Sequence, residues 1–310
     1  MAISAADVKK LREMTGAGMM DCKKALTETD GNFDEAIEFL RKKGLASAEK
    51  KAGRIAAEGI VLTVVSDDSK TATMIEVNSE TDFVAKNDVF QTYVRGLAEQ
   101  INSGDYADMD AFMAAKSEID PSATVEEHHK AMIAKIGENL SIRRFEKIST
   151  DGLVVSYIHA GGKIGVLVEA ETDSNSDAVK EAMKNVAMQV AALHAKYVST
   201  DEISEEYRAH ELSILVEQAK NDPKNANKPE NILEKMSLGR LNKELKEICL
   251  LEQTYVKAEN KESVKDYVAA VAKAEGCTFA IKKFVRFETG EGLEKKNEDF
   301  AAEVAAQMGK

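Results

Sequence analysis

The chain has 310 residues, of which 44% are apolar and 5% are aromatic, and it contains no tryptophan. This length is enough for about two domains, and their cores must consist mainly of aliphatic side chains. The formal net charge is −12, which argues against a nucleic-acid backbone or an anionic membrane surface as the main ligand, because both attract clustered lysine and arginine. We therefore expect no direct nucleic-acid binding and no membrane binding.

Residues 1–54 predict a small helical domain. Apolar side chains recur at helical spacing in its first and third helices, at Val8, Leu11, Met14, Phe33, Ile37 and Leu40. Asp30-Gly-Asn32 is a strong turn signal between the second and third helices. The stretch 44–57 is rich in Ala, Lys and Gly, and we expect it to be a connecting segment that is partly helical.

A weak internal repeat follows the helical domain. In each copy, two short strand patterns lead to a Thr-Asp pair, at Thr81-Asp82 and at Thr172-Asp173, and a helical pattern comes next. We expect two similar α+β units, each with a small antiparallel sheet covered by helices on one face. The predicted subdomains are residues 55–147 for the first and residues 148–195 with 236–287 for the second.

An inserted helical hairpin is predicted at residues 196–235. Two stretches of strongly helical composition, 203–220 and 229–247, flank the polar loop 221–228. The hairpin is a candidate contact for a homodimer, and packing on the body or contact with a partner are the alternatives. Residues 278–287 then predict a strand that returns to the sheet.

The last part of the chain, residues 288–310, predicts a C-terminal helical module. Residues 291–307 form its helix and carry apolar side chains at Leu293, Phe300 and Val304. The length and position of this helix make it a candidate arm for docking elsewhere.

No residue pattern indicates an enzyme. Cys22, Cys249 and Cys277 show neither a Cys-x-x-Cys pair nor metal-ligand spacing, so we expect buried free thiols and no metal. The glycines of residues 159–165 join two strand patterns and lack the Ser or Thr of a phosphate-binding loop, which indicates a hairpin turn. His128-His129 lie in an acidic helix pattern and are expected to be solvated. We predict no catalytic residue and no cofactor.

The N-terminus indicates a cytoplasmic protein. Residues 1–7 lack a basic stretch followed by an apolar one, so they do not resemble a signal peptide. The sequence has no run of about 18 apolar residues that could cross a membrane. We therefore expect a soluble protein in the cytoplasm.

The most informative segment is 73–87, which predicts a strand, a polar corner and the start of a helix. The polar residues before Asp82-Phe83 favour a turn or a helix cap. Most phenylalanines belong to a core, but this one follows a polar run, and the second repeat has Ser174 at the matching place. Phe83 is therefore a candidate for an exposed side chain that a partner would bury.

Thr81-Asp-Phe-Val-Ala-Lys-Asn87 resembles the signature of the translation elongation factor Ts family. Further segments resemble that family in the same order along the chain, at residues 11–26, 135–144, 159–168 and 287–294. The resemblance therefore spans nearly the whole chain. It implies an N-terminal domain that resembles the ubiquitin-associated fold, at residues 1–54.

The resemblance also implies a function. Members of the family are guanine nucleotide exchange factors for elongation factor Tu, in its GDP-bound and nucleotide-free forms. It implies that Phe83 acts as a wedge that displaces Mg²⁺, with Thr81, Asp82 and Val84 completing the wedge. Other candidate partner-binding residues lie on the helical domain, on a turn of the first unit and in the glycine-rich turn: Arg12, Met19, Met20, Lys51, Ile136, Gly137 and His159.

Two other classes of function remain open from the sequence. A non-catalytic scaffold would bind a GTPase without changing the release of its nucleotide. An enzyme that acts on nucleotides would turn over its substrate alone, and no motif in the chain supports that chemistry. An exchange assay with elongation factor Tu distinguishes all three.

Overall fold

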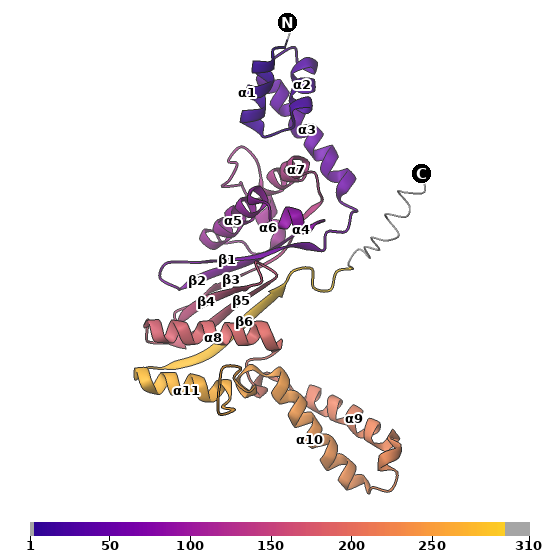
Figure 1. Ribbon diagram of the computed structural model, residues 1–310, viewed down its shortest axis with the longest axis vertical. Helices are drawn as coiled ribbons and strands as arrows, with labels where there is room; N and C mark the ends of the chain where they lie inside the picture. Colours follow the sequence, from indigo (N-terminus) through magenta and orange to yellow (C-terminus); the bar gives the residue numbers. More distant parts are fainter. Residues whose placement is uncertain (1–2, 295–310) are drawn as a thin grey trace.

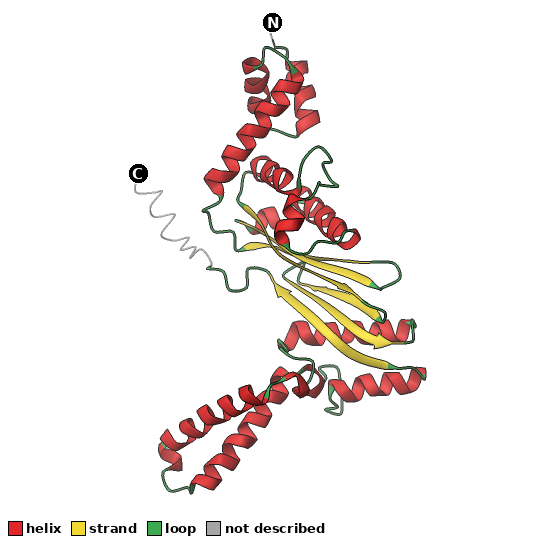
Figure 2. Cartoon of the chain, turned by 180° about the vertical axis from the view of Figure 1, so that it is seen from behind, coloured by secondary structure: helices red, strands yellow, loops and turns green. Residues whose placement is uncertain are grey.

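The computed structural model describes residues 3–294 of the chain. Its body contains two three-stranded antiparallel sheets that pack face to face, with helices on the outer face of each (Figure 1). The helical domain lies at one end of the long axis and a helical hairpin projects from the other end (Figure 2). The predicted α+β class with two antiparallel units is confirmed.

The N-terminal helices are α1 (Ala5–Thr15), α2 (Met19–Glu28) and α3 (Phe33–Lys51). Ser4 caps α1 through a capping box, and Gly16 ends it with a left-handed backbone. Helix α3 is longer than expected, because it continues through the first half of the predicted connecting segment. It packs against α7 (Val125–Ile136) of the body, where a Cβ on Gly44 would lie 3.6 Å from Ala134.

The first unit contains β1 (Glu58–Val65), β2 (Thr71–Ser79) and β3 (Leu140–Ser149) in the order β1-β2-β3. Four helices, α4 to α7, lie between β2 and β3. Besides α7, they are α4 (Asp82–Ala85), α5 (Asp88–Ser103) and α6 (Met109–Ala114). The apolar side of α5 covers the sheet with Phe90, Val94, Leu97 and Ile101, all buried. Strand β3 was not predicted from the sequence.

The second unit contains β4 (Leu153–His159), β5 (Ile164–Thr172) and β6 (Phe279–Glu288), again in antiparallel order. Helices α8 (Asp177–Leu193) and α11 (Val264–Glu275) cover its outer face. The inner faces of the two sheets meet over a shared apolar core. Its buried members are Val61, Ala72, Met74, Ile148, Val154, Leu167 and Phe287.

The inserted hairpin consists of α9 (Glu205–Asn221) and α10 (Glu230–Ile248). Three short 3₁₀ turns accompany it, at Thr200–Glu202, Pro223–Asn225 and Leu250–Glu252. Buried apolar side chains join the two helices and their base, namely Ile203, Leu215, Leu241, Leu245 and Cys249. Because α10 extends to Ile248, a domain boundary at residue 235 would divide a helix. A homodimer through this hairpin stays a prediction.

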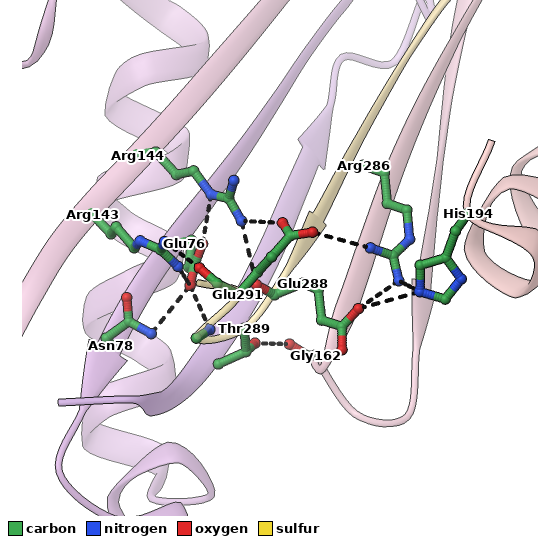
Figure 3. A network of polar contacts seen from close by, with 11 residues as sticks. Glu76, Asn78, Arg143, Arg144, Gly162, His194, Arg286, Glu288, Thr289 and Glu291 are labelled. Atoms are coloured by element: carbon green, nitrogen blue, oxygen red, sulfur yellow. Dashed lines mark hydrogen bonds and ion pairs between the residues drawn. The ribbon is translucent and has the colours of Figure 1, made fainter. Parts of the chain in front are cut away.

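A buried carboxylate ties the end of β6 to the first sheet (Figure 3). The side chain of Glu76 on β2 is fully buried and accepts hydrogen bonds from Arg143 at 3.0 Å and from Arg144 at 2.6 Å. The backbone N–H of Gly290 donates to the same carboxylate at 2.8 Å. Gly290 has φ +72°, and a Cβ there would lie 2.1 Å from the carbonyl oxygen of Ala57. Only glycine fits this place without a shift.

The same segment also binds the second sheet. The backbone N–H of Thr289 donates to the carbonyl of Lys163, and its hydroxyl donates to the carbonyl of Gly162, each at 2.9 Å. Residues 289–291 therefore connect both units. The first residues of the predicted C-terminal helix, 291–293, form a turn, and the rest of that helix lies outside the described residues.

Replacing Glu76 with alanine is expected to lower the free energy of unfolding by about 3 kcal/mol, because two arginines and a backbone N–H lose their buried partner. Urea denaturation measures this loss. Glu146→Ala is the matched control, since Glu146 pairs with Lys283 at 2.6 Å but its side chain is 37% exposed. It should cost less than about 1 kcal/mol. Equal losses in the two variants would contradict the role given to Glu76.

His129 corrects an expectation from the sequence. It is buried rather than solvated, and its ring lies between two partners. Tyr93 donates its hydroxyl proton to Nδ1 at 2.7 Å, and Nε2 donates to the carbonyl of Leu140 at 3.0 Å. Burial lowers the pKa of His129 from 6.5 to about 4. The imidazole is therefore neutral in the folded protein at neutral pH.

Stability is expected to fall as the pH drops from about 6.5 towards 4. In this range the unfolded chain binds a proton at the histidine that the folded chain excludes, so acid favours unfolding. The free energy of unfolding is therefore expected to be about 3 kcal/mol higher above pH 6.5 than at pH 4, because of this histidine. Urea unfolding at several pH values measures it in the wild type and in His129→Gln. The pH slope should be smaller in the variant, and an unchanged slope would contradict this assignment.

Among residues 3–294, no helix is long and apolar enough to cross a membrane.

Candidate functional site

The corner after β2 is built by local capping. The strand ends at Ser79, whose hydroxyl donates to the carbonyl of Thr81 at 2.9 Å. Thr81 has an extended backbone, and its side chain accepts a hydrogen bond from the N–H of Val84 at 3.3 Å. This N-cap starts the single turn of α4. Of the polar residues that suggested a turn or a cap in the sequence, Thr81 forms the cap, and Ser79 forms a hydrogen bond with the carbonyl of Thr81.

The turn of α4 separates its apolar side chains. Ala85 is buried and Val84 packs against the core of the first unit. Phe83 points away from that core and is 82% exposed, more than any other large apolar side chain in the described part of the chain. A ring in this position contributes little to its own fold. Its exposure agrees with the expectation from the sequence.

Asp82 stays ionised at the start of this turn. Its carboxylate accepts a hydrogen bond from Lys86 at 2.6 Å, and this contact holds the pKa of Asp82 below its usual value. Lys163 lowers the pKa of Asp82 further through its charge. The corner therefore presents an aromatic ring next to a fixed negative charge.

The glycine-rich turn lies beside the corner. It joins β4 to β5 as a hairpin, and Ala160, Gly161 and Gly162 all have positive φ. Lys163 in this turn pairs with Glu58 at the start of β1 at 2.5 Å. His159 is exposed, and its Nδ1 lies 3.0 Å from the hydroxyl of Tyr157. The prediction of a hairpin turn rather than a phosphate-binding loop is confirmed.

The end of α7 also reaches the corner. Gly137 ends the helix with φ +89°, and Ile136 beside it is partly buried. The next residue, Glu138, accepts hydrogen bonds at its carboxylate from the backbone N–H of Thr81 at 3.0 Å and from its hydroxyl at 2.7 Å. The structure therefore brings together the α4 turn, the end of α7 and the glycine-rich turn.

The remaining predicted contact residues lie on the helical domain. Arg12 on α1 is exposed, and Met19 and Met20 at the start of α2 are 50% and 75% exposed. Lys51 lies at the end of α3, half-buried, and donates to the hydroxyl of Ser47 at 2.8 Å. These are the candidate contact residues of the helical domain, which α3 connects to the body.

The strand registers correct the alignment of the two repeats. Ser79 pairs with the first residue of β3 and Thr172 with the first residue of β6, so these two residues correspond. The sequence comparison had instead matched Thr81 with Thr172. Asn87, the N-cap of α5, follows Ser79 by eight positions, whereas Ser176, the N-cap of α8, follows Thr172 by four. The first unit thus has four extra residues, the length of α4.

Sequence reasoning missed Glu80 in the corner, and Glu138 and Asn139 just before β3, which form hydrogen bonds between these two segments. Glutamate is a common surface residue, and the neighbours of Glu80 and Glu138 in the sequence gave no sign of contacts between the two segments. No group of three or more His, Cys, Asp or Glu side chains within residues 3–294 could hold a metal ion. The arrangement offers a braced apolar side chain beside a charge, which is typical of surfaces that bind other proteins.

An exposed ring on a capped turn is a feature that a partner protein would bury. The family model described as Elongation factor TS matches residues 80–291. Elongation factor Ts of Clostridioides difficile (strain 630) is 53% identical over 306 residues, 99% of each chain. That of Trichlorobacter lovleyi is 48% identical over 314 residues, 100% of this chain and 99% of the relative.

This chain belongs to the elongation factor Ts family. The family consists of nucleotide exchange factors that act on elongation factor Tu in translation elongation, and membership assigns the chain to that class.

Phe83→Ala is expected to leave the free energy of unfolding within about 0.5 kcal/mol of the wild type, because the ring is exposed. Phe90→Ala is the matched comparison, since Phe90 on α5 is fully buried. It should cost about 3–5 kcal/mol. Chemical denaturation measures both. A large loss in Phe83→Ala would mean that the ring supports the fold.

Proposed function

We propose that the protein binds elongation factor Tu with GDP and uses Phe83 as a wedge beside the Mg²⁺ site of the partner. Burial of the ring between elements of the partner displaces the segments that position Mg²⁺. The metal is then lost and GDP dissociates, so that GTP can enter. The protein itself supplies no covalent chemistry in this scheme.

The observation that carries the proposal is the exposure of Phe83 on a turn that only the first unit contains. Thr81 caps this turn, Val84 and Ala85 anchor it to the core, and Asp82 forms an ion pair with Lys86. A ring on a mobile segment would lose conformational entropy on binding. A ring on a capped and anchored turn loses less, so more of its burial energy remains for distorting the partner.

Phe83 alone provides a limited part of the effect. Burial of one phenylalanine side chain is worth at most roughly 3 kcal/mol, which corresponds to about two orders of magnitude in affinity. Only the part that is gained in the distorted state of the partner accelerates release of GDP. Other contacts must supply the rest of the coupling free energy.

We propose that these contacts come from two groups of the residues described above. One comprises Ile136, Gly137 and His159 around the corner. The other comprises Arg12, Met19 and Met20 on the helical domain, with Lys51 at its base. Methionine side chains adapt to varied surfaces, and both methionines of α2 are exposed. Because coupling between sites is reciprocal, GDP must weaken binding of the factor as much as the factor weakens binding of GDP. The nucleotide-free partner is therefore expected to bind most tightly.

A non-catalytic scaffold is the second candidate function. The exposed methionines and the projecting hairpin would suit such a role. It differs in one outcome, since a scaffold binds the GTPase without changing the rate at which GDP leaves.

Phe83→Ala is expected to lower the rate of GDP release at subsaturating factor more than about tenfold, because the burial energy of the ring is lost. Stopped-flow release of a fluorescent GDP analogue from elongation factor Tu measures it. Phe83→Leu retains an apolar side chain and should lose less. Val256→Ala removes an exposed side chain of the second unit and should leave the rate unchanged. A wild-type rate in folded Phe83→Ala would refute the wedge, and a wild-type factor that binds without accelerating release would indicate the scaffold.

A further inference from the structure

Two carboxylates form hydrogen bonds between the corner after β2 and the residues just before β3. Glu138 accepts the backbone N–H and the hydroxyl of Thr81, at 3.0 and 2.7 Å. In the opposite direction, Glu80 accepts the backbone N–H of Asn139 at 2.5 Å. Each segment thus supplies one carboxylate and one backbone donor to the other. Hydrogen bonds to ionised acceptors are roughly twice as strong as neutral ones.

The second unit shows which of these contacts the fold itself requires. By strand register, Glu80 corresponds to Asp173 and Asn139 to Thr278. Asp173 accepts the backbone N–H of Thr278 at 2.8 Å, so the contact made by Glu80 occurs in both units. In both units this contact joins the residue after the middle strand to the residue before the third strand.

The contact made by Glu138 has no counterpart in the second unit. The corresponding residues there are Cys277 and Ser174, and a thiol is a poor acceptor. The backbone N–H of Ser174 is instead satisfied by the hydroxyl of Thr172, at 3.1 Å. The unit that lacks the extra helical turn therefore also lacks the carboxylate that holds the residue before it.

We propose that Glu138 is a positioning residue that fixes the direction of the α4 turn and hence of the Phe83 ring. Thr81 is the N-cap of α4, so holding both its N–H and its hydroxyl fixes the residue from which the turn starts. Glu138 directly follows Gly137, which ends α7. The carboxylate thereby sets the distance between the ring and the Ile136-Gly137 turn, two segments of one docking surface. This inference rests on the proposed function of Phe83.

The hydrogen bonds of Glu80 and Asn139 also reach the segment that joins the helical domain to the body. The side chain of Asn139 donates to the carbonyl of Arg54 at 2.8 Å, and the guanidinium of Arg54 lies 3.4 Å from Glu80. Asn139 therefore contacts both the corner, through Glu80, and the base of the helical domain, through Arg54.

Loss of the two hydrogen bonds between Glu138 and Thr81 is expected to reduce the fraction of molecules in which the Phe83 ring has the binding orientation. If about a fifth of the molecules retain that direction, the rate of GDP release at subsaturating factor falls about fivefold. At saturating factor the partner selects the correct orientation, and the maximal rate recovers. Phe83→Ala lowers both rates, since no ring remains to be positioned.

The test compares GDP release from elongation factor Tu for Glu138→Ala, Phe83→Ala and the double variant, at subsaturating and saturating factor. Glu138→Ala should show the fivefold loss only at subsaturating factor. In the Phe83→Ala background it should cause no further loss. Glu138→Gln keeps one acceptor oxygen and the same shape, so it should lie between the wild type and Glu138→Ala.

Glu127→Ala is the matched control. Glu127 completes the capping box at the other end of α7 with Thr124, so its loss weakens the same helix without touching the corner. It should leave both rates unchanged. Thermal unfolding of every variant identifies losses of rate that come from unfolding.

Three outcomes separate the proposals. A loss in Glu138→Ala that persists in the Phe83→Ala background would show that Glu138 acts independently of the ring, and wild-type kinetics in folded Glu138→Ala would also overturn the positioning role. An unchanged rate in Phe83→Ala would instead overturn the wedge itself.

Discussion

Glu76 is the contact on which the arrangement of the two units depends. A fully buried carboxylate carries a large desolvation cost unless it is paired and hydrogen-bonded. Here it receives Arg143 and Arg144 from β3, an amide of Asn78 from its own strand and the N–H of Gly290 after β6. Because Thr289 binds the glycine-rich turn, the same few residues hold both sheets and the turn beside the corner (Figure 3).

The contacts around Glu76 support the corner that carries the exposed ring. An apolar side chain in water gains nothing for its own fold, so a turn that exposes Phe83 must be stabilised by other contacts. Thr81 caps it, Ala85 anchors it and Glu138 accepts hydrogen bonds from its N-cap residue, Thr81. The stability of the corner and its capacity to bind a partner are therefore supplied by different residues. The same separation explains how the second unit keeps the fold without this turn.

Much of the fold followed from the sequence because amphipathic periods are local. Strand patterns before residues 81 and 172 and helical patterns after them predicted the two units, and the turn chemistry of residues 79–81 predicted a cap. Strand β3 was missed for a physical reason. Its register shifts opposite Glu76 and Val77, so its apolar residues do not alternate regularly, and Arg143 and Arg144 interrupt them. His129 was misjudged because the partner that buries it, Tyr93, lies 36 positions away.

The sequence by itself determined the secondary elements other than β3, the expectation that Phe83 is exposed, and the family, since these depend on residue types and motifs that are read along the chain. Only the tertiary structure decided that α4 is an extra turn, because strand register and not residue identity aligns the two units. It alone placed Glu138 on Thr81, 57 positions apart. Hydrogen bonds between distant segments depend on how the chain returns through the sheet, and no local pattern records that path.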